Sequence, residues 1–167
     1  MSPRVVLIGA PGAGKSTVGA LLANYLDCDF VDSDEVIVAE EKMSIADIFV
    51  EKSESYFRSI EKSIVLRLLT DATGVLALGG GSVMDEGVQQ ALQGLEVVWL
   101  EITLAEAVHR VGLNQSRPLL LGNVRSNMKN LLATRNAIYE KLATIKVDAA
   151  NSPEAIVRLI AEKIATP

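Results

Sequence analysis

Short apolar runs alternate along the chain with longer stretches in which apolar residues recur every three to four positions. The runs are rich in β-branched and aliphatic residues, as buried strands are, and the longer stretches have the period of amphipathic helices. Because strands separated by helices favour right-handed β-α-β units, the pattern predicts a mostly parallel sheet covered on both faces. Ligands of such sheets bind at the carboxyl ends of the strands. Strands are predicted over 4–8, 29–31, 74–78, 96–101 and 144–147, and helices over 15–26, 33–41, 44–50, 54–70, 86–92, 104–111, 125–142 and 153–165.

A phosphate-binding motif lies between the first predicted strand and the first predicted helix. Residues 9–16 read G-A-P-G-A-G-K-S, a complete G-x-x-x-x-G-K-[ST] loop. Its glycines allow the backbone to curl so that N–H groups and the helix N-terminus point at an anion. Lys15 would reach the β- and γ-phosphates, and the Ser16 hydroxyl would ligate Mg²⁺. A glycine-rich turn without a ligand is disfavoured because strand, loop, Lys-Ser pair and helix all agree, so the loop predicts binding of a nucleoside triphosphate.

Composition restricts the remaining possibilities. The 167 residues have the length of one domain, and 49% hydrophobic with 22% charged residues is an ordinary globular balance. The net charge of −5 gives no electrostatic footprint for nucleic acid, and no apolar run approaches the roughly 20 residues of a membrane span. Cys28, the only cysteine, is expected to be a small buried hydrophobe near a strand start. Residues 1–4 lead directly into the first strand and leave no room for a signal peptide, so we expect a cytoplasmic protein.

Two carboxylates follow the second predicted strand, at the edge of the sheet that also carries the phosphate loop. Asp32 and Asp34 are separated by one residue. One could hold Mg²⁺ through water, and the other could accept the proton of an attacking hydroxyl. The alternative is that Ser33 or Asp34 caps the following helix.

Basic residues and glycines supply a second set of candidates. Arg58 and Glu61 are three apart on a predicted helix, a spacing that by default indicates a surface salt bridge. Phe49 and Phe57 are nearby, however, and an Arg beside aromatic walls suits a small carboxylate. Three glycines, 79–81, directly after a buried strand would let a ligand approach the backbone closely. Arg135 is a further cationic candidate, and the sole histidine, His109, is expected to be a surface or packing residue.

Residues 112–123 lack a clear period, have a glycine near each end and contain Arg117. A loop of this length in a compact domain is usually functional or disordered. We predict a mobile lid whose Arg117 stabilises charge on the transferring phosphoryl group. A solvated surface loop is the alternative.

These features together resemble those of the shikimate kinase family, in the same order and spacing across essentially the whole chain. The resemblance rests on the phosphate loop (9–17), Asp32-x-Asp34, Phe57-Arg58-x-x-Glu61, the triple glycine, Arg117-Pro118-Leu119-Leu120 and Arg135. It implies one kinase domain over 1–167, with a three-layer α/β/α P-loop fold, a central five-stranded parallel sheet and a mobile lid. It also implies transfer of the γ-phosphoryl group of ATP to the 3-hydroxyl of shikimate, with Mg²⁺ as cofactor, on the route to chorismate and the aromatic amino acids.

The resemblance further implies roles for individual residues. Lys15, Asp34 and Arg117 would be catalytic, and Ser16 would bind Mg²⁺ directly while Asp32 acts through water. The shikimate-binding region would cover about 32–61, together with residues contributed from later in the chain. The nucleotide would contact Gly12, Ala13, Gly14, Lys15, Ser16, Thr17, Arg110, Arg117 and Pro118, and shikimate would contact Asp34, Phe49, Phe57, Arg58, Glu61, Gly79, Gly80, Gly81, Leu119 and Arg135.

One departure and two alternatives accompany this interpretation. Relatives often carry an Arg in the loop after the last strand, and 148–153 contains none, so we expect weaker nucleotide affinity or base selectivity with the chemistry unaffected. A kinase for another small hydroxylated acid, such as gluconate, would also use two arginines and Asp34. A non-catalytic nucleotide-binding module is disfavoured because Lys15, Ser16, Asp34 and Arg117 are all present. No unassigned apolar stripe is evident, so we expect a monomer whose partners are ATP and shikimate.

Overall fold

Five parallel strands form the centre of the molecule in the computed structural model, which describes residues 2–112 and 123–165. The strand order is β2-β3-β1-β4-β5, and every neighbouring pair is parallel. The five-stranded parallel sheet predicted from the sequence is confirmed. The strands are β1 (Val5–Ile8), β2 (Phe30–Asp32), β3 (Val75–Ala77), β4 (Val97–Glu101) and β5 (Ile145–Asp148).

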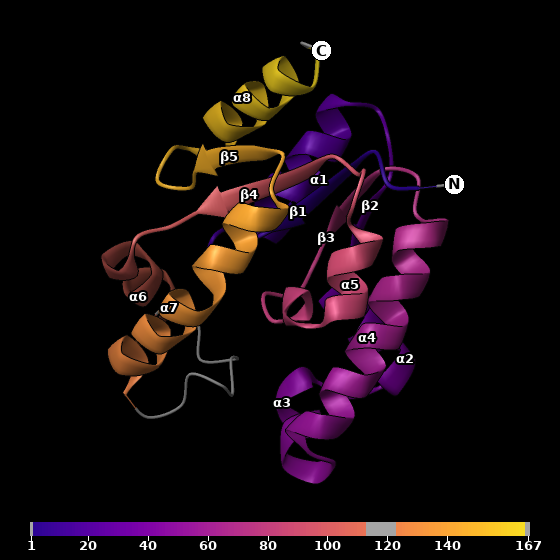
Figure 1. The fold of residues 1–167 in the computed structure, drawn as a ribbon, viewed down its shortest axis with the longest axis vertical. Coiled ribbons are helices and arrows are strands. Elements are labelled where there is room, and N and C mark those ends of the chain that lie inside the picture. Colours follow the sequence, from indigo (N-terminus) through magenta and orange to yellow (C-terminus); the bar gives the residue numbers. More distant parts are fainter. Residues whose placement is uncertain (1, 113–122, 166–167) are drawn as a thin grey trace.

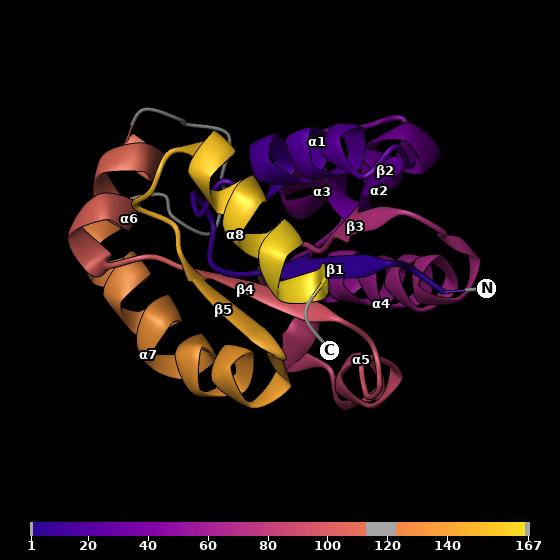
Figure 2. The ribbon, with the colours of Figure 1, turned by 90° about the horizontal axis from the view of Figure 1, so that it is seen from above.

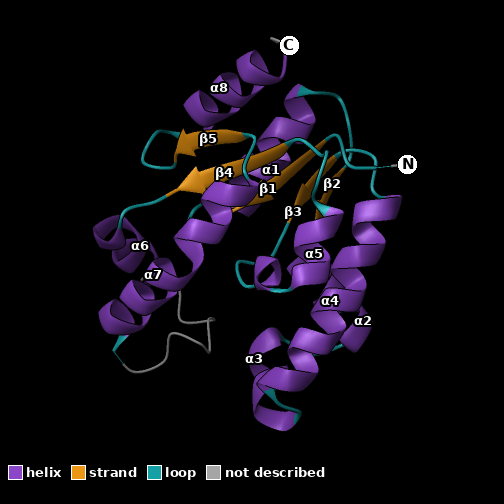
Figure 3. Ribbon diagram, in the orientation of Figure 1, coloured by secondary structure: helices purple, strands orange, loops and turns teal. Residues whose placement is uncertain are grey.

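Helices cover both faces of this sheet, as predicted. Helices α1 and α8 lie against one face and pack on each other, and α4, α5 and α7 lie on the other side (Figure 2). Figure 3 shows the same layers coloured by type of element. The helices are α1 (Lys15–Tyr25), α2 (Ser33–Glu41), α3 (Ile45–Glu51), α4 (Glu54–Asp71), α5 (Glu86–Ala91), α6 (Leu104–Gly112), α7 (Val124–Leu142) and α8 (Pro153–Ala165), with a short 3₁₀ turn at Ser82–Met84.

The main hydrophobic core lies between these layers. The central strand β1 is buried along its whole length, because a strand covered by helices on both faces needs apolar side chains on both. A second, smaller cluster forms where α2, α3 and α4 meet, and its buried members are Ile37, Ile48, Phe57 and Ile64. Figure 1 shows α3 and one end of α4 projecting beyond the sheet on the side where this cluster lies.

The strand order determines where functional groups converge. Because β3 lies between β1 and β2, the segments that follow these three strands leave the same edge of the sheet side by side. They are the phosphate loop after β1, Asp32 to Asp34 at the end of β2, and the triple glycine after β3. Within the described residues, no helix is long and apolar enough to cross a membrane.

Candidate active site

The phosphate loop joins β1 to α1 through backbone conformations that only glycine adopts easily. Gly12 and Gly14 have φ values of 83° and 91°, and Gly14 forms the N-cap of α1. The Nζ of Lys15 donates to the carbonyl oxygens of Gly9 and Ala10, at 2.7 and 3.0 Å. The loop therefore ends with the N-terminus of α1 and with Lys15 lying across it, as an anion-binding loop requires.

Asp32 connects this loop to the end of β2. The hydroxyl of Ser16 donates to one carboxylate oxygen of Asp32, and the other accepts the backbone N–H groups of Asp34 and Glu35 at 2.9 and 3.4 Å. Asp32 is thus the N-cap of α2, and the alternative in which Ser33 or Asp34 caps this helix is wrong. The capping bonds fix the Asp32 side chain beside Ser16, so the hydroxyl oxygen of Ser16 and a carboxylate oxygen of Asp32 lie next to each other.

The triple glycine is surrounded by the charged residues that the sequence singled out. A Cβ atom on Gly79 would lie 2.7 Å from Oδ1 of Asp34 and 2.9 Å from Oε2 of Glu61. On Gly81 it would lie 2.5 Å from a guanidinium nitrogen of Arg58. These distances leave no room for a side chain at Gly79 or Gly81 unless the charged groups move. The glycines therefore allow three charged side chains from α2 and α4 to approach one stretch of backbone.

Gly80 brings the other parts of the site together. A Cβ atom there would lie 3.3 Å from a guanidinium nitrogen of Arg135 on α7. It would also lie 3.2 Å from the carbonyl oxygen of Gly9 and 3.2 Å from Cδ of Pro11, both in the phosphate loop. The charged cluster around the glycines thus lies directly beside the phosphate loop.

Arg58 and Glu61 form an ion pair, but it is not a surface salt bridge. Their nearest atoms are 2.6 Å apart, and Glu61 is only 3% exposed. Burial raises the pKa of Glu61, and the neighbouring guanidinium of Arg58 opposes that effect. Arg58 also lies 5.2 Å from the ring centre of Phe57, which in turn packs on Phe49. Arg58 is therefore held by a carboxylate and an aromatic ring, with about a third of its side chain exposed.

A cavity of about 620 Å³ opens beside this cluster, between α4, the 3₁₀ turn and α7. Arg58, Glu61, Gly81 and Arg135 line it. Arg135 is 7% exposed although it carries a charge. The cavity thus contains two arginine side chains whose guanidinium groups could bind a carboxylate, and it is large enough for a small molecule. Its lining also includes residues that the sequence analysis did not identify, among them Glu54, Lys62, Met84, Asp85, Asn127 and Asn130.

Comparison with known proteins identifies the family. The family model described as shikimate kinase matches residues 11–165. The chain belongs to the shikimate kinase family. It is 45% identical to a shikimate kinase of Thermobifida fusca, over 97% of this chain and 95% of that protein. It is 46% identical to one of Mycobacterium avium, over 98% of this chain and 94% of that protein.

Solved structures agree with membership of the shikimate kinase family. A shikimate kinase from Acinetobacter baumannii in complex with shikimate has a TM-score of 0.94 and 29% identity, covering 99% of this chain and 94% of that one. A gluconokinase from Sinorhizobium meliloti has a TM-score of 0.61 at 18% identity, covering 98% of this chain and 92% of that one, and shares the fold alone. The family, the ATP-dependent kinase activity and the P-loop fold predicted from the sequence are confirmed.

Arg110 is a candidate nucleotide-binding residue that lies outside the phosphate loop and within the described residues. It is half-buried on α6 and donates to the carbonyl oxygens of Gly12 and Ala149, at 3.2 and 2.7 Å. Glu106 accepts a further bond from it at 2.9 Å. Arg110 thus ties the phosphate loop to the loop after β5. That second loop is the one that lacks an Arg of its own.

The other sequence predictions are only partly covered by the structure. His109 is exposed, as expected of a surface residue, and Cys28 is half-buried against the main core rather than fully buried. Of the predicted lid, only the flanking Gly112, which ends α6, and Asn123, which caps α7, are described. Arg117, Pro118 and Leu119 lie outside the described residues.

Sequence reasoning missed two buried side chains that hold the triple glycine. The Ser33 hydroxyl accepts the N–H of Gly79 at 3.0 Å, and the Tyr139 hydroxyl donates to the carbonyl oxygen of Gly80 at 2.6 Å. Tyr139 follows Arg135 by four residues and so shares its helix face, which is the one local signal that could have identified it.

Proposed function

We propose that this protein transfers the γ-phosphoryl group of ATP to the 3-hydroxyl of shikimate, which binds at the triple glycine beside the phosphate loop. One observation carries the proposal. Asp34, Arg58 and Arg135 come from three different helices, and all lie against the three consecutive glycines, while Gly80 also contacts the phosphate loop. This arrangement supports an anion-binding pocket next to the position that the transferable phosphoryl group would occupy.

The two arginines suit the carboxylate of the acceptor. A guanidinium group binds a carboxylate through two parallel hydrogen bonds, and such charge-assisted bonds are stronger than neutral ones. Arg58 is held by Glu61, and Arg135 is largely buried, so both are oriented before a ligand arrives. Preformed cations in a partly enclosed cavity lose little conformational freedom on binding, and that favours affinity.

Asp34 is the group that would act on the hydroxyl. In the transfer, the bond between the γ-phosphorus and the oxygen of ADP breaks, and a bond from phosphorus to the acceptor oxygen forms. The hydroxyl proton leaves in the same process, and a carboxylate at Asp34 can accept it. Lys15 and the N–H groups of the phosphate loop would stabilise the charge that develops on the phosphate oxygens.

The donor set at the loop fits Mg²⁺. Ser16 and Asp32 offer hard oxygen ligands that are already hydrogen-bonded to each other. Within residues 2–112 and 123–165, no cluster of three or more His, Cys, Asp or Glu side chains could hold a metal on its own. Mg²⁺ commonly takes one or two protein ligands and completes its shell with water and nucleotide phosphates, so these two residues suffice. Bound there, Mg²⁺ would neutralise charge on the phosphate oxygens.

A coupled assay of ADP release tests the proposal with three reactions: shikimate, gluconate and no acceptor. Gluconate is the relevant competitor because it also carries a carboxylate beside hydroxyl groups. We expect turnover with shikimate at least about 100-fold above the other two, since only the correct acceptor places its hydroxyl at Asp34. Faster turnover with gluconate, or equal rates with and without an acceptor, would lead us to withdraw the assignment.

A further inference from the structure

Tyr139 lies on α7, one helical turn after Arg135, and none of its surface is exposed. Its hydroxyl donates a 2.6 Å hydrogen bond to the carbonyl oxygen of Gly80. Burial raises the pKa of Tyr139 to about 12, so the hydroxyl keeps its proton near neutral pH and remains a donor. The helix that carries Arg135 is therefore hydrogen-bonded, through Tyr139, to the middle residue of the triple glycine.

The bonded carbonyl belongs to the peptide group that joins Gly80 to Gly81. Because a peptide group is planar, holding this carbonyl also fixes the direction of the Gly81 N–H. Gly80 is the glycine beside Arg135, and Gly81 is the one beside Arg58. The hydroxyl of Tyr139 thus fixes the peptide group that lies between the two arginines.

The opposite flank of the same loop is held in a similar way. Ser33 is fully buried at the start of α2, and its hydroxyl accepts the N–H of Gly79 at 3.0 Å. The hydroxyl of Ser82, also buried, donates to the carbonyl oxygen of Gly79 at 2.8 Å. Glycine has the greatest backbone freedom of all residues, so three in succession keep one shape only where neighbouring groups hold them. Here buried hydroxyl groups supply those bonds.

We propose that Tyr139 is a positioning residue for the acceptor: through the Gly80 carbonyl it holds the triple glycine in the shape that lets Arg58 and Arg135 bind one carboxylate together. Ser33 does the same from the Asp34 side. The inference rests on the proposed function, because it takes the carboxylate to be that of shikimate. Small displacements of binding groups weaken two-point recognition strongly, so losing this bond affects ligand binding although Tyr139 itself does not line the cavity.

The variant Tyr139→Phe tests this role. It keeps the ring that packs on Trp99, with ring centres 5.9 Å apart, and removes only the hydroxyl. We expect shikimate affinity, measured by titration calorimetry, to fall about tenfold, because a buried carbonyl loses its donor and the loop relaxes. ATP affinity should stay within about twofold of wild type. The methyl ester of shikimate, which lacks the carboxylate charge, should lose less affinity than shikimate does.

Tyr56→Phe is the matched control, since the Tyr56 hydroxyl donates at 2.9 Å to Glu41 and lies outside the cavity. It should leave both affinities unchanged. If Tyr139→Phe does not fold, Ser33→Ala tests the same loop from its other flank. The expected result is the same: shikimate affinity falls and ATP affinity stays nearly unchanged. Shikimate affinity within twofold of wild type, or a parallel loss for both substrates, overturns the inference.

Wild-type turnover is measured first. An enzyme without shikimate-dependent turnover fails the proposed function, and the inference falls with it. An active wild type whose folded Tyr139→Phe variant binds shikimate normally overturns the inference alone.

Discussion

The phosphate loop and the acceptor pocket are neighbours, but they are built in opposite ways. The loop is one continuous segment whose shape comes from its own glycines, at Gly12 and Gly14, and from the start of α1. The pocket combines α2, α4, α7 and the segment after β3, and its charged groups meet only because these elements pack together. The comparison teaches that the shape of the phosphate loop is encoded locally, whereas the proposed acceptor pocket depends on tertiary structure. Substitutions in the two regions should therefore have separable effects on turnover and on shikimate affinity.

The largest effect is expected where the two regions meet. Asp34→Asn would remove the proposed acceptor of the shikimate hydroxyl proton and should lower kcat by about 10²- to 10⁴-fold. Binding of ATP should change little, because Asp34 lies against Gly79 rather than in the phosphate loop. Steady-state kinetics and ATP titration provide the two readouts. Turnover close to wild type would remove Asp34 from the mechanism.

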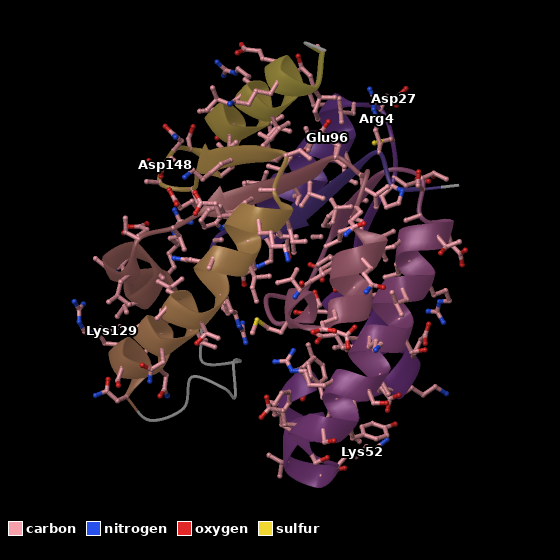
Figure 4. All side chains as sticks on the ribbon, viewed as in Figure 1. Arg4, Asp27, Lys52, Glu96, Lys129 and Asp148 are labelled. Carbon is pink, nitrogen blue, oxygen red and sulfur yellow. The ribbon has the colours of Figure 1, made fainter. Side chains whose placement is uncertain are left out.

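Lys15→Ala tests the loop itself. Charge that develops on the β- and γ-phosphate oxygens loses its fixed cation, so kcat should fall by about 10²- to 10³-fold with folding intact. Lys52→Ala is the control, since Figure 4 places Lys52 at the end of the molecule where α3 meets α4, and its side chain is more than a third exposed. A folded Lys15→Ala enzyme that turns over normally would contradict the loop assignment.

Arg135→Ala should act on the acceptor alone. Loss of a charge-assisted contact to a carboxylate costs roughly 1.5–3 kcal/mol, or about 10- to 150-fold in shikimate affinity. Arg58→Ala should behave similarly, and ATP affinity should be nearly unchanged in both. Lys129→Ala is the matched control. Lys129 is an exposed cation on the same helix, and its side chain points away from the cavity side of α7 (Figure 4). If Arg135→Ala weakened only ATP binding, its place in the acceptor pocket would have to be given up.

Asp32→Asn should affect the dependence on metal more than the maximal rate. Asn is as good an N-cap as Asp, so α2 should remain intact while the charge beside Ser16 is lost. We expect the Mg²⁺ concentration for half-maximal rate to rise about 10- to 100-fold, with much of the rate restored at high Mg²⁺. A rate defect that is indifferent to Mg²⁺ would argue against the metal role.

The smallest effect is expected at Glu61 and appears as a dependence on pH. Burial raises the pKa of Glu61 in the folded state. The contribution of Glu61 to the free energy of unfolding is therefore fully present below the ordinary pKa of 4.5, and it is lost as the pH rises through the raised pKa. In urea titrations, the free energy of unfolding of the wild type relative to that of Glu61→Gln should therefore decrease as the pH rises from 4.5 through the raised pKa. Glu54→Gln is the control, since the Glu54 carboxylate is exposed and 3.8 Å from Arg58. A difference that grows with pH would reverse the sign and refute the argument.

The sequence predicted the fold well where local signals suffice. Helices 33–41 and 153–165 have the expected bounds, and each strand lies within one residue of its predicted position. Strand β2 extends to Asp32, because the backbone of Asp32 still pairs with Ala77 while the Asp32 side chain already caps α2. Residue propensities do not reveal this double role. The 3₁₀ turn Ser82–Met84 was not predicted, because three residues are too few to show a hydrophobic period.

The candidate site was predictable as a set of residues but not as a geometry. The motifs identified Asp34, Arg58 and Arg135, whose separation in sequence gives no indication of how closely they approach the glycines. The partners of Ser33 and Tyr139 are 46 and 59 residues away, so no local pattern could indicate these bonds. The burial of Glu61 was also invisible, because a spacing of three on a helix is the same on a buried and on an exposed face.

The packing of Trp99 on Tyr139 has a practical consequence. Trp99 is the only tryptophan of the chain, it is 3% exposed on β4, and its ring contacts the tyrosine whose hydroxyl holds Gly80. Indole fluorescence responds to small changes in surrounding dipoles and charges. The enzyme therefore carries a built-in optical probe behind its acceptor pocket, and we expect shikimate binding to be visible in stopped-flow emission without a dye or a coupling enzyme.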